Sequence, residues 1–128
     1  MKAIFKIIIS IVFVFILISA CGIFYLQQGL NDGSKIIVNG ISISDLNDGI
    51  YNGEYNAGRW TNRVNVTVKN HKITKIDIED DVTFVMEGLS DEIFDRVIKA
   101  QNTNIDTISQ ATVTSKAYLK SIENALHD

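Results

Sequence analysis

The segment from residue 106 to residue 115 places several hydroxyl groups in front of a helical pattern. These hydroxyls belong to Thr107, Ser109, Thr112, Thr114 and Ser115. Side chains of this type favour a turn that caps a helix, because their oxygens accept hydrogen bonds from the unpaired N–H groups of the first turn. We expect the cap at Thr114, or at Thr112 if the helix begins earlier. A threonine at this positive end of a helix is well placed to carry an anionic phosphate, either bound or covalently attached.

The pattern from residue 114 to residue 126 predicts an amphipathic helix that closes the chain. Apolar side chains recur at helical spacing on one side, namely Tyr118, Leu119, Ile122, Ala125 and Leu126. Polar side chains fall on the other side, namely Lys116, Lys120, Glu123 and His127. We therefore expect the first set to pack on a core and the second to face solvent.

The residues before this helix resemble the signature of the FMN-binding domain family, whose members include the flavin-carrying subunits of membrane electron-transport complexes. The family pattern is an Asp, two residues, a Ser or Thr, usually a Gly, then Ala and Thr, and this chain reads Asp106, Ser109, Gln110, Ala111 and Thr112. In that family the last Thr is joined to the phosphate of FMN by a phosphoester bond that a separate flavin transferase installs. The resemblance thus implies FMN as the cofactor, bound at these residues and attached covalently to Thr112.

A second stretch of resemblance opens the same domain. Members of the family often begin with Asp-Gly, an aromatic residue and another Gly two positions on, as in residues 48–53 here. The resemblance therefore covers residues 48–126 and implies one FMN-binding domain over residues 48–128.

A bound flavin needs a flat apolar slot beside its phosphate anchor. The candidate side chains for this slot are Tyr51, Tyr55, Trp60, Phe84 and Met86. Each of them, taken alone, is also explained by ordinary packing. Trp60 is favoured because residues 57–60 form a glycine-containing loop between strands, where a large aromatic has little other reason to be.

Alternation and turn signals between these stretches predict a small antiparallel sheet. Three strands are expected, at residues 50–56, 63–69 and 74–78. The middle strand has valine at every second position, facing the core. Residues 69–72 supply a turn, so that the last two strands form a hairpin with Ile76 and Ile78 pointing inward.

A second helix is expected from residue 91 to about residue 101. Ser90 is placed to cap it, and the Asn-Thr-Asn sequence at residues 102–104 is placed to end it. Its buried stripe consists of Ile93, Phe94, Val97 and Ile98. Together the elements predict an α+β fold, a small antiparallel sheet with two helices packed on one face, preceded by an N-terminal transmembrane helix.

The N-terminus indicates a membrane anchor over residues 1–26. Residues 7–26 form an uncharged, mostly apolar run of the length that a helix needs to cross a bilayer. Lys2 and Lys6 precede the run, which favours an inside N-terminus and an outside domain. The Ile-Ser-Ala-Cys sequence ending at Cys21 also resembles the lipobox at which bacterial lipoproteins are cut and lipidated. The apolar run continues past this cysteine, which favours an uncut helix over a lipid anchor.

Residues 27–47 are expected to form a polar tether followed by a small hairpin at residues 36–43, with a type I′ turn at residues 39–40. All 15 acidic residues follow position 26, whereas two of the 12 basic residues precede it. The outer part is therefore more acidic than the whole chain, whose formal net charge is −3. This balance excludes a nucleic-acid-binding protein.

The sequence shows no pattern typical of a metal site or of nucleophilic catalysis. Asp77, Glu79 and Asp81 share one strand face, but their spacing matches no loop motif, so we expect a solvated acidic face and no metal. His71 falls in a turn and His127 at the terminus, where a solvated surface residue is expected. No nucleophile, base and orienting acid occur together, so we expect no enzyme active site.

The interpretation that unites these features is a membrane-anchored extracytoplasmic electron carrier with one covalent FMN. Its expected partners are a flavin transferase, membrane lipid, an electron donor in the membrane and an extracytoplasmic acceptor. Two alternatives remain open at this point. The first is a non-covalent FMN or haem binder, and the second is a cofactor-free interaction module at the cell surface.

Overall fold

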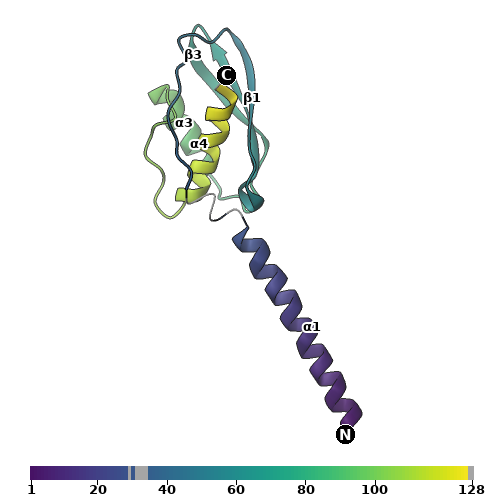
Figure 1. Cartoon of the computed structure of the whole chain (residues 1–128). Helices are drawn as coiled ribbons and strands as arrows, with labels where there is room; N and C mark the ends of the chain where they lie inside the picture. The colour runs from purple at the N-terminus through teal and green to yellow at the C-terminus, as the bar shows by residue number, and fades with distance from the viewer. Residues whose placement is uncertain (29, 31–34, 127–128) are drawn as a thin grey trace.

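The computed structural model describes residues 1–28, residue 30 and residues 35–126. Its elements are, in chain order, α1 (Lys2–Gln27), β1 (Gly49–Tyr55), the 3₁₀ helix η1 (Gly58–Trp60), β2 (Asn62–Lys69), β3 (Lys72–Asp80), α3 (Leu89–Ala100) and α4 (Thr112–Leu126). Figure 1 shows α1 standing away from a small domain, in which the three strands pack with α3 and α4. The predicted α+β fold with an apolar N-terminal helix is confirmed.

Helix α1 has no buried residue and is, by length and composition, long and apolar enough to cross a membrane. Cys21 lies exposed within it, and the helix continues without a break to Gln27. The lipobox-like sequence is therefore part of one continuous helix.

The sheet has the order β1-β2-β3, and both strand pairs are antiparallel. β2 alternates as predicted, with Val64, Val66 and Val68 buried. Asn70 and His71 turn the chain into β3 with φ angles of 53° and 60°. Two positive φ angles are what a type I′ hairpin turn requires, so the predicted hairpin between the last two strands is confirmed.

β3 extends beyond the expected residues 74–78 at both ends and contains irregularities in its register with β2. Ile76 faces the core as expected, and Ile78 packs partly buried against it. A register shift between Thr67 and Val68 also brings Ile73 to the core, three residues before Ile76. Strict alternation misses Ile73 because an extra residue in one strand changes which face the following side chains occupy.

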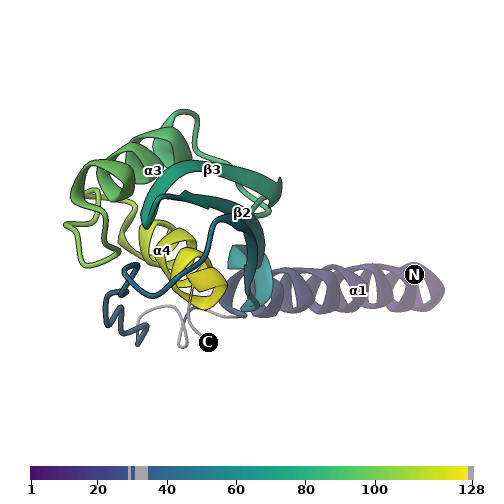
Figure 2. The same cartoon turned by 90° about the horizontal axis from the view of Figure 1, so that it is seen from above.

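Helix α4 packs on β1 and β2, and the sheet curves around it, as Figure 2 shows. Tyr118, Leu119 and Ile122 of α4 are fully buried. Gly53 of β1 allows the helix to approach closely, because a Cβ at this position would stand 2.5 Å from the backbone nitrogen of Ala125 and 2.6 Å from its Cβ.

Helix α3 packs against β3 and α4. Ile93, Phe94 and Val97 of its predicted stripe are buried, and Ile98 is partly buried against the same core. The Phe94 ring meets the Tyr118 ring edge to face, with 5.8 Å between the centroids. Both helices thus share one core with the sheet.

The ends of α3 differ from the prediction. The helix starts earlier, with Gly88 at the cap position and a φ of 78°, so Ser90 lies within the first turn and does not cap it. Gln101, rather than the Asn-Thr-Asn sequence that follows, closes the helix with a φ of 53°. Its side-chain amide accepts from the N–H of Ile73 at 2.7 Å and donates to the carbonyl of Ile73 at 2.9 Å. This pairing with edge strand β3 offsets the strain of a left-handed residue that is not glycine.

Residues 36–43 form no strand, so the predicted hairpin is wrong. Backbone groups of this segment bond to side chains instead. The N–H of Asn39 donates to Glu123 Oε2 at 2.9 Å, and the N–H of Ile41 donates to Asn102 Oδ1 at 3.2 Å. The segment, dark blue in Figure 1, passes beside α4.

Glu123 was expected on the solvent side of α4, yet it is only 1% exposed. Lys120 Nζ lies 2.8 Å from Glu123 Oε1, while the N–H of Asn39 bonds to the other carboxylate oxygen. A buried carboxylate is tolerated when both oxygens are paired in this way. Residues 36–43 therefore cover the face that periodicity assigned to solvent. His127 lies outside the described residues.

Tyr118 ties α4 to the loop that follows β3. Its hydroxyl donates to Asp81 Oδ1 at 2.5 Å, and the same oxygen accepts from the N–H of Val82 at 2.7 Å. Asp81 was expected to belong to a solvated acidic face, but one of its carboxylate oxygens also accepts these two hydrogen bonds. Burial, together with the hydrogen bond and charge of Asp81, raises the pKa of Tyr118 above its usual range.

We expect Gly53→Ala to lower the free energy of unfolding by about 1–3 kcal/mol or more, because the added methyl group overlaps the α4 backbone. Urea unfolding of the full chain in detergent measures the change. Gly49→Ala is the matched control. Gly49 lies in the same strand as Gly53, and a Cβ at Gly49 would meet no atom within 4 Å. Equal stability of the two variants would contradict the close approach of α4 to β1.

We expect Tyr118→Phe to cost about 1 kcal/mol at neutral pH, through loss of the hydrogen bond to Asp81. Because the pKa of Tyr118 is raised by folding, the folded chain keeps a proton that the unfolded chain loses above its ordinary value of 10.0. The stability contributed by this hydroxyl is thus fully present below that pH and lost as the pH rises above it. Urea unfolding at neutral pH and at about pH 11 should show the gap between wild type and Tyr118→Phe shrinking at the higher pH. A constant gap would contradict the raised pKa.

Candidate functional site

The domain contains a pocket of about 510 Å³, and its lining includes η1, the element that contacts α1. Its walls come from η1, from the loop after β3, from the start of α4 and from a residue just beyond α1. The lining residues are Leu30, Arg59, Trp60, Val82, Phe84, Met86, Gln110, Ala111, Thr112, Val113 and Thr114. The volume falls within the range of about 300–1,000 Å³ that is usual for cofactor and small-molecule sites.

The start of α4 forms one wall. Thr112 is the first residue of the helix, so the cap position falls on Ala111, whose carbonyl accepts from the N–H of Ser115 at 2.8 Å. Thr114, the expected cap, therefore lies inside the first turn, and the cap prediction is wrong in both of its forms. Thr112 is exposed at the pocket. The unpaired N–H groups of this first turn give the wall a partial positive charge.

Gln110 shapes the turn that leads into α4. It has a φ of 71°, and the turn is closed by a hydrogen bond of 3.1 Å from the N–H of Ala111 to the carbonyl of Ile108. Glycine reaches such a φ without strain, whereas another residue pays about 1–2 kcal/mol. Gln110 thus supplies the left-handed turn at the position where the signature usually has Gly.

Trp60 is held in place by two buried polar residues. Its carbonyl accepts from Asn62 Nδ2 at 3.0 Å, and Ser121 Oγ of α4 donates to Asn62 Oδ1 at 2.6 Å. Asn62 and Ser121 are fully buried, and Trp60 itself is 6% exposed. This chain of hydrogen bonds links η1, which carries the wall containing Trp60, to α4, which carries the wall containing Thr112.

Arg59 is the charged residue of the pocket lining, and sequence reasoning did not single it out. Its Cζ lies 4.2 Å from the centroid of the Trp60 ring and 5.6 Å from that of Phe84, both distances within reach of a cation–π interaction. Its Nε is buried and has no hydrogen-bond partner among the described residues. Leaving such a donor unpaired costs roughly 1–3 kcal/mol. A hydrogen bond to an oxygen atom of a ligand would recover this cost.

The structure brings most of the predicted site residues together. Those that line the pocket are Trp60, Gln110, Ala111, Thr112 and Thr114. The slot candidates Phe84 and Met86 line it as well. Arg59 was detectable in the sequence as a basic residue next to the favoured aromatic, but its contact with Phe84 depends on the packing of a distant loop.

Other predicted residues lie outside the pocket lining. Asp106 and Ser109 are exposed, and the carbonyl of Asp106 accepts from Arg96 Nη1 on α3 at 3.2 Å. The hydroxyl of Tyr51 donates to the carbonyl of Asn47 at 2.7 Å. Tyr55 also does not belong to the lining. Among the described residues, no group of His, Cys, Asp and Glu side chains is placed to hold a metal ion.

The residues of the pocket fit a flavin mononucleotide. Trp60, Phe84 and Met86 offer apolar surface to a flat ring, while Arg59 and the first turn of α4 offer positive charge and N–H donors to a phosphate. Thr112 adds a hydroxyl at the helix terminus where a phosphate is favoured.

Comparison with known proteins agrees with this fit. Residues 59–127 match the family model described as FMN-binding domain, so the match covers more than half of the chain and begins at Arg59. A search of the curated proteins finds no match. β1 precedes the matched residues but belongs to the same sheet. FMN is accordingly the cofactor, and the chain belongs to the FMN-binding domain family.

Proposed function

We propose that this protein is a membrane-anchored, extracytoplasmic electron carrier that holds one FMN esterified to Thr112. The observation that carries the proposal is the position of Thr112, exposed at the first turn of α4 and lining the pocket shared with Arg59 and Trp60. When bound, FMN supplies the redox chemistry, accepting and releasing one or two electrons. The protein supplies attachment, orientation and the surrounding charge.

Among the candidate hydroxyls, position and exposure favour Thr112. Ser115 is fully buried, and its oxygen accepts from the N–H of Ile108 at 3.4 Å. Thr107 and Ser109 are not among the residues that line the pocket. Thr114 lines it but is only partly exposed, whereas Thr112 is exposed. In esterification the Thr112 oxygen forms a bond to the phosphorus of an activated flavin nucleotide, the leaving group departs, and the hydroxyl proton passes to solvent. A separate flavin transferase would supply that nucleotide and catalyse the step.

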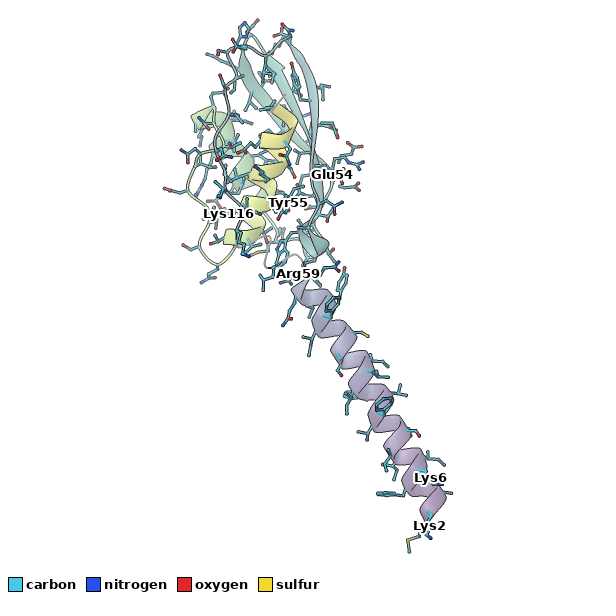
Figure 3. All side chains as sticks on the ribbon, viewed as in Figure 1. Lys2, Lys6, Glu54, Tyr55, Arg59 and Lys116 are labelled. Carbon is cyan, nitrogen blue, oxygen red and sulfur yellow. The ribbon has the colours of Figure 1, made fainter. Side chains whose placement is uncertain are left out.

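The anchor supports placing the domain outside the membrane. Lys2 and Lys6 lie at the end of α1 that is remote from the domain, as Figure 3 shows. Basic residues at one end of an apolar helix favour the inside for that end. The division of the chain that follows is an uncut helical anchor over residues 1–26, a connecting segment over residues 27–47 and the FMN-binding domain over residues 48–128. The electron donor would then be a membrane component and the acceptor an extracytoplasmic one.

Colour distinguishes this function from the alternatives. The full chain is purified from cells that also make a flavin transferase. A yellow protein that keeps its colour after denaturation supports covalent FMN. Colour lost on denaturation would support a non-covalent cofactor, and a colourless protein would contradict flavin carriage under these conditions.

We expect Thr112→Val to abolish denaturation-resistant flavin, because valine keeps the shape and bulk of the side chain while removing the hydroxyl. Mass spectrometry of the intact chain should then show the unmodified mass. Thr114→Val is the matched control and should keep the attached flavin, since it deletes a hydroxyl two positions further along the same helix. Covalent flavin on Thr112→Val would show that the attachment residue is wrong.

We expect Arg59→Gln to weaken FMN binding about tenfold, equivalent to about 1.4 kcal/mol, because it removes a charged donor from the pocket. The measurement uses the Thr112→Val chain, in which FMN binds without attachment, and follows quenching of flavin fluorescence. Arg63→Gln is the control, because it removes the same charge from a half-buried arginine outside the pocket lining, which pairs with Glu54 at 3.2 Å. Equal affinities for both variants would exclude Arg59 from the FMN site.

A further inference from the structure

Three consecutive large apolar side chains are exposed in the loop between β3 and α3. Phe84 is 53% exposed, Val85 58% and Met86 46%. We refer to these residues as the apolar loop. Exposed apolar side chains gathered at one place are a feature of surfaces that bind a ligand, a protein or a membrane.

The apolar loop lies at the same end of the domain as the anchor helix. The N–H of Thr83, the residue before it, donates to the carbonyl of Arg59 in η1 at 2.9 Å. η1 in turn meets the end of α1, where Gly58 lies against the carbonyl of Gln28. Figure 3 shows Arg59 at the junction of the domain and α1. The apolar loop is therefore tied, through one short helix, to the end of the anchor.

The length of chain between anchor and pocket limits how far this end of the domain stands from the bilayer. The apolar run of residues 7–26 rises about 30 Å as a helix, which matches the thickness of the hydrocarbon core. Leu30 lines the pocket together with Phe84 and Met86. Leu30 is three residues beyond Gln27, the last residue of α1, so the chain between these two residues spans at most about 10 Å. The headgroup layer of one leaflet is about 5–7 Å thick, so the pocket rim lies within reach of it.

We propose that the apolar loop docks into the headgroup layer of the same bilayer that holds α1, so that the flavin pocket opens toward the membrane surface. Arg59 and Trp60 behind the loop are residue types that suit this layer, because both combine apolar surface with a polar group. The exposed Glu87 bounds the apolar run, so the insertion is limited to the three residues of the loop.

The docking has a consequence that rests on the proposed function. With the pocket rim at the bilayer, a lipid-soluble or membrane-embedded donor reaches the flavin from the membrane side. An aqueous acceptor must then meet the domain from another direction or after the loop leaves the lipid. The docking itself requires no flavin, so it is tested without one.

Trp60 is the single tryptophan of the chain and lies at this end of the domain, so its fluorescence reports the distance to lipid. The full chain, made without a flavin transferase, is reconstituted into phosphatidylcholine vesicles that carry a nitroxide either on the headgroup or near the end of the acyl chain. We expect strong quenching by the headgroup label and weak quenching by the deep label.

A second chain supplies the comparison at the far end of the domain. It combines Trp60→Phe with Ile50→Trp, because Ile50 is 72% exposed at the start of β1, beside the β2–β3 turn. We expect headgroup quenching of this distal tryptophan to be at least about threefold weaker than that of Trp60, since short-range quenching falls off over the length of the sheet. Circular dichroism and thermal unfolding of this second chain are measured to check that it keeps the fold.

The apolar loop itself is tested by Val85→Asp, which places a charge in the loop without altering a residue of the pocket lining. We expect quenching of Trp60 by the headgroup label to fall about twofold or more, because an aspartate opposes insertion. Ile50→Asp makes the same change at the distal end and should leave the quenching of Trp60 unchanged.

The proposal is overturned if Trp60 is quenched no more than the distal tryptophan, or if Val85→Asp and Ile50→Asp behave alike. The first result would assign the apolar loop to a protein partner that the vesicles lack. Absence of covalent flavin from the wild-type chain made together with a flavin transferase would count against the proposed function. It would leave the quenching results untouched, so the two failures are distinguishable.

Discussion

The close packing of α4 into the curved sheet is the constraint on which the rest of the domain depends. Gly53 allows the helix to approach β1, and the buried face of α4 completes the core. Two hydrogen-bonded links then extend from α4 to the other pocket walls. Ser121 reaches η1 through Asn62, and Tyr118 reaches the loop after β3 through Asp81. Any shift of α4 would therefore be transmitted to the wall that contains Trp60 and to the loop after β3.

Local pattern was sufficient for the parts of the fold that depend on local chemistry. The valines of β2, the turn after it and the buried stripes of both helices follow from alternation and helical period. The errors arise where a distant side chain decides the outcome. Residues 36–43 have a strand-like sequence, but Glu123 and Asn102 bind their backbone groups, and Glu123 is buried as a result. Gln101 likewise closes α3 because Ile73 of β3 pairs with its amide. Contacts of this kind cannot be predicted from the periodicity of apolar residues within a single helix or strand.

The pocket residues also divide into those that the local sequence predicts and those that depend on distant contacts. Gln110, Ala111 and Thr112 are consecutive and precede a clear helix, so their shared position at its start was predictable. Trp60 was predictable as a large aromatic in a glycine-containing loop. Arg59 was detectable beside Trp60, but its contact with Phe84 was not predictable. The hydrogen bond from Thr83 to Arg59 and the link from Asp81 to Tyr118 hold the loop that carries Phe84. Tyr51 illustrates the opposite error, since this candidate for the flavin slot packs against the core and does not line the pocket.

The pocket and the apolar helix α1 meet at the same end of the domain. Its acidic surface lacks a general affinity for the anionic headgroups of a membrane, so charge alone would not hold it there. Under the proposed function, α1 replaces that affinity with a high effective concentration, which makes each encounter with a membrane component intramolecular in character. Within this arrangement Arg59 is a local exception to the negative charge of the domain. A cation held between two aromatic rings favours an anionic group in the pocket without making the whole surface basic. The apolar helix α1 and the affinity for a flavin phosphate are thus separated onto different parts of the chain, and η1 is the element where the two parts meet.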